Sequence, residues 1–146
     1  MKCSFDKASF PRWLALADRE FAAANKLFPE LKDKSAWHYH QSAERYLKAF
    51  LVSQDALQGL DPSNEIIDLR LLASHCGSVD PAFLLNGPID LVRDGVMLDK
   101  MSTWVSAFEQ PPEPGNPDPS LPTEDELFAA RGICLLLRRG LVGGGL

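Results

Sequence analysis

Residues 38–51 read HYHQSAERYLKAFL, and this stretch decides the fold. Its apolar side chains recur every three or four residues, which is the pattern of one face of an α-helix. The members of this face are Tyr39, Ala43, Tyr46, Leu47, Phe50 and Leu51. We expect a long helix from about Ser35 to Leu57, because Gly59 and the pair Asp61-Pro62 then interrupt the helical pattern.

Four further segments carry helical periodicity, and no segment shows the convincing alternation of a β-strand. They are expected at about residues 11–28, 64–76, 88–108 and 124–139, with a short helical turn at 81–85. Gly77 stands where a left-handed C-cap belongs, and Thr123 with Glu126 forms a capping box. The predicted fold class is therefore all-α, an antiparallel up-and-down bundle of about five helices.

The length of 146 residues fits a single domain, residues 1–146. Residues 109–122 hold six of the eleven prolines, so we expect an extended Pro-rich loop there. The last residues, 142–146, are rich in glycine and are expected to form a flexible tail.

The charge balance argues against several function classes. Fifteen Lys and Arg against twenty Asp and Glu give a net charge of −5, unlike a protein that coats nucleic acid. No apolar run approaches the roughly 20 residues of a membrane span, and no apolar signal core follows Met1, so a cytoplasmic protein without membrane contact is expected.

The cysteines and histidines indicate neither a metal site nor a cofactor. The three cysteines are an odd number without a CxxC pair, so free thiols are expected. His38 and His40 are two residues apart, whereas helical metal pairs need a spacing of three or four.

The densest polar cluster lies on the long helix. Gln41, Glu44 and Lys48 share one helical face, and Glu44 precedes Lys48 by four residues, the favourable order for an ion pair. Two interpretations remain open. The face is either a solvated surface with one ion pair, or a shallow polar cleft in which Lys48 meets an anionic ligand.

The same helix resembles the HEPN family (higher eukaryotes and prokaryotes nucleotide-binding domain). The family pattern Gln-x-x-Glu-Lys-x-Leu-Lys-Ala-x-Leu is matched by residues 41–51, with Arg45 in place of the usual Lys. A Trp-x-x-x-Ala-x-x-x-Phe opening at Trp13 and an Asp-Leu-x-x-Leu-like segment at residues 67–72 agree with it. The resemblance covers a core of about residues 12–139.

The resemblance implies a ligand site and partners. It assigns the ligand-binding set Gln41, Glu44, Arg45, Lys48 and Asp68. It also implies a nucleotide or RNA ligand, a homodimer, and a small nucleotidyltransferase as partner protein. Two family positions differ, because its His is Ile67 here and its Arg-Tyr-Pro is residues 109–111, Glu-Gln-Pro. We therefore expect a non-catalytic nucleotide-binding or interaction module rather than an enzyme.

Two alternatives stay open. The ribonuclease branch of the family uses an Arg and a His separated by four to six residues, and Arg70 with His75 has that spacing. This alternative is a metal-independent RNase toxin of a toxin–antitoxin pair, although about 140° separates the two side chains on one helix. The other is a structural dimeric bundle. The segment 88–108 is apolar on more than one face, which predicts a homodimer through this fourth helix.

Overall fold

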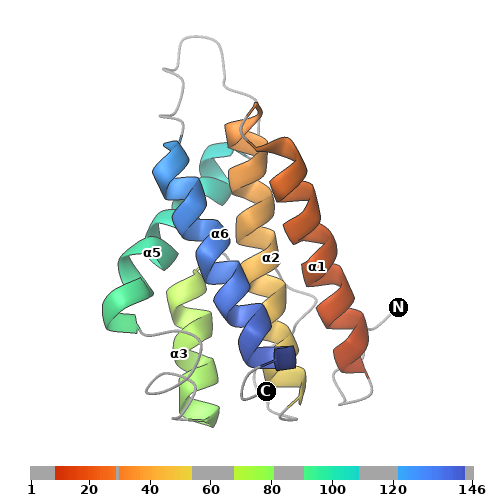
Figure 1. Cartoon of the computed structure of the whole chain (residues 1–146). Helices are drawn as coiled ribbons and strands as arrows, with labels where there is room; N and C mark the ends of the chain where they lie inside the picture. Colours follow the sequence, from red (N-terminus) through yellow and green to blue (C-terminus); the bar gives the residue numbers. More distant parts are fainter. Residues whose placement is uncertain (1–8, 29, 54–67, 81–90, 109–121, 144–146) are drawn as a thin grey trace.

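A computed structural model describes residues 9–28, 30–53, 68–80, 91–108 and 122–143 (Figure 1). In this part of the chain every regular element is helical. The elements are α1 (Phe10–Leu27), α2 (Lys32–Ser53), α3 (Leu69–Val79), α5 (Leu91–Phe108), α6 (Glu124–Arg138) and a π-helical turn η2 (Arg139–Gly143). The prediction of an all-α bundle of five main helices is confirmed for the described residues. None of the described helices is long and apolar enough to span a membrane.

Helix α2 is the centre of the bundle, because α1, α3, α5 and α6 all pack against it (Figure 1). Its buried side chains lie on every side of the axis: Tyr39, Tyr46 and Leu47 are buried on one side, and Ser42, Ala49 and Val52 on the other. Because only a short connection separates α1 from α2, the two helices run antiparallel along their lengths.

The contact between α1 and α2 is fixed by hydroxyl groups of α2. Ser35 Oγ donates a hydrogen bond to the carbonyl of Ala24 at 2.8 Å, and Ser42 Oγ donates to that of Ala17 at 3.0 Å. Both alanines are fully buried, so small side chains let the two backbones approach closely. These bonds set how far α1 can slide along α2.

The beginning of α6 confirms the predicted capping box. The Glu126 backbone N–H donates to Thr123 Oγ1 at 3.1 Å, and the Thr123 N–H donates to Glu126 Oε1 at 2.9 Å. The hydrogen bond from Thr123 and the neighbouring ammonium of Lys100 lower the pKa of Glu126.

The prediction of Gly77 as a left-handed C-cap is wrong. Helix α3 continues through Gly77 to Val79, and its cap residue is Asp80 in an extended conformation. The Asp80 N–H closes the last turn by donating to the carbonyl of Cys76 at 3.0 Å, an ordinary helical bond. Gly77 itself is buried, so tertiary packing decides the helix end here.

Several predicted features lie outside the described residues. These are the extension of the second helix to Leu57, the starts of the third and fourth helices at 64 and 88, the turn at 81–85, residues 109–121 of the Pro-rich loop, residues 144–146 of the tail, Cys3, Ile67 and residues 109–111.

The interior of the bundle holds thiol and phenol groups that stay protonated. Cys76 and Cys134 are buried free thiols, as expected, and burial raises the pKa of both, that of Cys134 to about 12. Burial also raises the pKa of Tyr39 to about 12 and that of Tyr46 in the same direction. All four groups are neutral in the folded bundle at neutral pH.

These shifts predict a loss of stability at high pH. The unfolded chain ionises its thiols and phenols near pH 9 and 10, whereas folded Cys134 and Tyr39 ionise only near 12. Because each folded pKa is raised, its stabilising contribution is full below the unfolded pKa and is lost as pH rises toward the folded one. Urea unfolding from about pH 8 to about pH 11 should show a falling free energy of unfolding, with a smaller slope for Cys134→Ala. A stability that is constant over this range would contradict the burial of these groups.

Candidate functional site

The predicted polar face of α2 is buried. Lys48 Nζ lies 3.1 Å from Glu44 Oε2, and the two side chains are 5% and 3% exposed. Gln41 is 4% exposed. The pairing of Glu44 with Lys48 was predicted correctly. The interpretation of this face as a solvated surface is wrong, because the fold encloses these side chains, and the contact of Lys48 with an anionic ligand stays a prediction.

Further side-chain contacts hold this face of α2 within the bundle. Arg45 Nη1 donates to Gln41 Oε1 at 2.7 Å and to the Gln41 carbonyl at 3.2 Å. The Lys48 ammonium lies 6.0 Å from the centre of the Trp13 ring, within cation–π range. The sequence motif thus brings Arg45 to Gln41 and Lys48 to Glu44, with Gln41, Glu44 and Lys48 buried and Arg45 half-buried.

Breaking the buried pair should destabilise the protein strongly. Lys48→Met removes the cation that lies 3.1 Å from the buried Glu44 carboxylate, so we expect a loss of about 3 to 5 kcal/mol in the free energy of unfolding. Replacing both members, as Glu44→Leu with Lys48→Met, should regain most of that loss. Urea unfolding measures both changes.

The exposed pair of Lys100 and Glu126 is the matched control. Its members lie 3.2 Å apart and are 51% and 28% exposed. Lys100→Met should therefore lower the free energy of unfolding by less than about 1 kcal/mol. Equal losses for Lys48→Met and Lys100→Met would show that burial adds nothing to the Glu44–Lys48 interaction.

Among the described contacts, Asp68 does not meet the other predicted ligand-binding residues, which all lie on α2. Its carboxylate is the N-cap of α3, where it accepts a hydrogen bond from the Leu71 N–H at 3.0 Å. Asp68 is exposed and has a favourable electrostatic effect on Arg70. Its role in the structure is to cap a helix.

Arg70 is engaged by α5 rather than by His75. Its Nε and Nη2 atoms donate to both carboxylate oxygens of Asp99 at 2.9 to 3.1 Å. These bonds raise the pKa of Arg70. The guanidinium lies over Gly95, where an added Cβ would come within 2.5 Å of it. Gly95 therefore allows a close approach of Arg70 to α5.

The arrangement predicts that Arg70 and His75 do not form a ribonuclease site. Arg70→Ala and His75→Ala should each leave any biological activity of the protein intact, because Asp99 neutralises the guanidinium. Overexpression of each chain, followed by examination of total RNA, tests this. RNA degradation by the wild type that His75→Ala abolishes would establish the toxin alternative instead.

The described part of α5 is largely covered by the bundle. Leu98, Met101 and Trp104 are buried against the other helices, and Val96 is 75% exposed. Of the five apolar side chains of α5 whose burial is described, Met97 is half-buried and only Val96 is exposed. A homodimer through α5 stays a prediction.

No group of three or more His, Cys, Asp or Glu side chains in the described residues is arranged to hold a metal ion. His38 Nδ1 contacts Glu20 Oε2 at 2.5 Å, and His40 is fully buried. The two histidines thus serve contacts inside the bundle.

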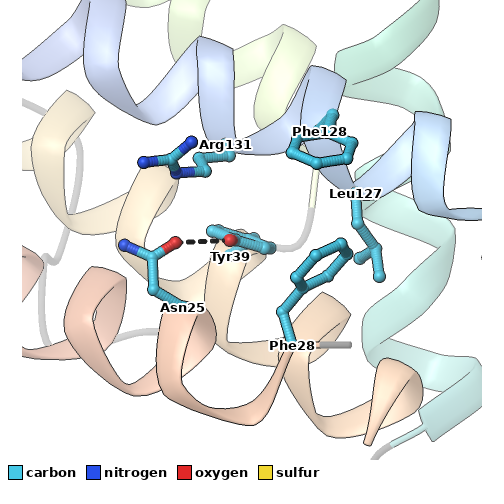
Figure 2. Close-up of a pocket in the computed structure, with 6 residues that line it drawn as sticks. All are labelled: Asn25, Phe28, Tyr39, Leu127, Phe128 and Arg131. Atoms are coloured by element: carbon cyan, nitrogen blue, oxygen red, sulfur yellow. Dashed lines mark hydrogen bonds between the residues drawn. The ribbon is translucent and has the colours of Figure 1, made fainter. Parts of the chain in front are cut away.

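A pocket that the sequence did not reveal lies between α1, α2 and α6 (Figure 2). Its volume is about 310 Å³. We call it the three-helix pocket, and its walls are Asn25, Phe28, Tyr39, Leu127, Phe128 and Arg131. Figure 2 shows the polar groups of Asn25, Tyr39 and Arg131 on one side and the apolar side chains on the other.

The apolar side of the three-helix pocket is built from two aromatic rings. The rings of Phe28 and Phe128 meet edge to face, with centres 5.2 Å apart and an interplanar angle of 64°. Phe128 is 54% exposed, so part of its surface is available to a ligand. Such rings bind flat apolar bodies well.

The polar side carries an available positive charge. The Tyr39 hydroxyl donates to Asn25 Oδ1 at 2.5 Å, which orients the amide of Asn25. Arg131 is exposed and makes no ion pair with any described residue. Because the pKa of Tyr39 is raised to about 12, its phenol is neutral at pH 7 and is a hydrogen-bonding group rather than a nucleophile.

Comparisons with known proteins found no match to this chain among protein-family models, curated protein sequences or solved structures. The described residues form an all-helical fold of five main helices.

Proposed function

We propose that the protein is a HEPN-like, non-catalytic module that binds a nucleotide in the three-helix pocket. The observation that carries the proposal is the cation Arg131, which makes no ion pair with a described residue, beside a pair of aromatic rings in a cavity of about 310 Å³. Ligand pockets for small molecules begin at about this volume.

The chemistry of a nucleotide suits the two sides of the pocket. A guanidinium donates two parallel hydrogen bonds to a phosphate, and Arg131 is placed to do so. A base is flat and has apolar faces, which suits the rings of Phe28 and Phe128. The oriented amide of Asn25 adds a hydrogen-bonding group on the polar side.

Two observations support binding without catalysis. Arg70, the cation of the alternative ribonuclease pair, is held by Asp99. Within the pocket, Tyr39 stays protonated, and none of the other lining residues is a general base or a nucleophile. The HEPN-like motif of α2 supports the family resemblance, on which a nucleotidyltransferase partner also rests.

Removing the Arg131 charge should weaken nucleotide binding. Because charge-assisted hydrogen bonds contribute about 1.5 to 3 kcal/mol, we expect Arg131→Ala to raise the dissociation constant of AMP or ATP about 10-fold to 100-fold. Isothermal titration of the purified protein measures this change. Arg131→Lys should lie between the two, because a lysine keeps the charge without the planar fork.

Arg19→Ala is the control, since Arg19 is an exposed arginine of α1 that does not line the pocket. It should bind nucleotide as the wild type does. Absence of binding to the wild type at millimolar nucleotide, or equal affinity of wild type and Arg131→Ala, would reject the three-helix pocket as a nucleotide site.

A further inference from the structure

The side of α6 that faces away from the bundle carries a self-complementary row of residues. Phe128, Gly132 and Leu135 of α6 and its C-cap residue Arg139 follow one another at intervals of three or four along this side. Phe128 and Leu135 are 54% and 43% exposed, whereas the opposite side of α6 is buried. Figure 1 shows α6 at the front of the bundle, with no described helix in front of it. We call this row the outer face of α6.

Gly132 has no explanation inside the described chain. A glycine in a helix interior is less favourable than alanine, so its presence calls for a neighbour that needs the space. At Gly95 that neighbour is Arg70, whose guanidinium an added Cβ would meet at 2.5 Å. At Gly132 an added Cβ would meet nothing within 4 Å. The space above Gly132 is thus free for the backbone of another molecule.

The charges on the outer face identify the molecule that fits it. Asp125 precedes Gly132 by seven residues, and Arg139 follows it by seven. Both are exposed, and neither makes an ion pair with a described residue. Phe128 lies four residues before Gly132 and Leu135 lies three after it, so the apolar residues are also nearly symmetric about the glycine.

A second copy in antiparallel orientation satisfies all these features. It places Arg139 of one copy against Asp125 of the other, twice, and Phe128 against Leu135. A parallel arrangement would instead set each charge against its own kind. A twofold interface needs a patch that is complementary to itself, and the outer face of α6 meets that need.

We propose that the outer face of α6 is a self-association surface, on which two copies of the chain pack with their α6 helices antiparallel and crossing at Gly132. The contact is centred on one helix from each copy, which is small for a protein interface, so the dimer is a weak one with a dissociation constant of about 10 to 100 μM. Phe128 belongs to both the outer face of α6 and the three-helix pocket, but Asp125, Gly132 and Arg139, the positions changed in the test, do not line the pocket, so the test reads self-association apart from nucleotide binding.

The test is sedimentation equilibrium of the full chain at concentrations up to about 500 μM. The wild type should dimerise, and Asp125→Lys and Arg139→Glu should each weaken dimerisation about tenfold by creating two like-charge contacts. An equimolar mixture of the two variants should form a heterodimer at least as readily as the wild type dimerises, because every contact then joins opposite charges. Arg19→Glu, a charge reversal on α1, is the control and should leave dimerisation unchanged.

Gly132→Ala gives a second, independent readout. Alanine favours the helix, so the melting temperature of the dilute monomer should rise. The added methyl keeps the two backbones apart, so the dimer dissociation constant should rise several-fold as well. A wild type that stays monomeric at about 500 μM, a mixture that forms no heterodimer, or a Gly132→Ala chain that dimerises unchanged would each overturn the proposal.

Discussion

The ion pair of Glu44 and Lys48 joins two buried side chains of α2, the helix against which the other main helices pack. Removing two charges from water is expensive, and the energy is recovered only when the charges meet each other in good geometry and find further polar contacts. The 3.1 Å contact meets the first condition. The two charges are four residues apart on one helix, so they neutralise each other within α2. Other helices can therefore pack against α2 on every side. The remaining helices pack around α2, and the hydrogen bonds of Ser35 and Ser42 set the position of α1 along it.

Much of this fold is legible in the sequence, because helical periodicity and capping are local. The apolar spacing of residues 38–51 predicts α2, and Thr123 with Glu126 marks the start of α6 to the residue. The pairing of Glu44 with Lys48 is local too. Its burial is not, since that depends on which helices cover the face. Gly77 misleads for the same reason, because a buried helix position outweighs the preference of glycine for a helix end.

The candidate binding site lies beyond local patterns altogether. Asn25, Tyr39 and Arg131 come from three helices, and only the packing of the bundle brings them to one pocket. Phe28 reads as a core residue in the periodicity of the first helix, and Arg131 is one charge among several on the last. The one signal in the sequence is the position of Phe128, an aromatic residue off the buried stripe of α6 and three residues before Arg131.

The Arg70 guanidinium lies over Gly95, so the effect of a substitution at position 95 on stability depends on the residue at position 70. An added methyl at position 95 must push aside the flexible end of Arg70, so disturbing its exposed pairing with Asp99 reduces the gain of about 1 kcal/mol that alanine brings to a helix. Once Arg70 has become a small residue, the same alanine is purely favourable. Positions 70, 95 and 99 therefore form an epistatic group, in which the stability gained from alanine at position 95 depends on the residues at positions 70 and 99.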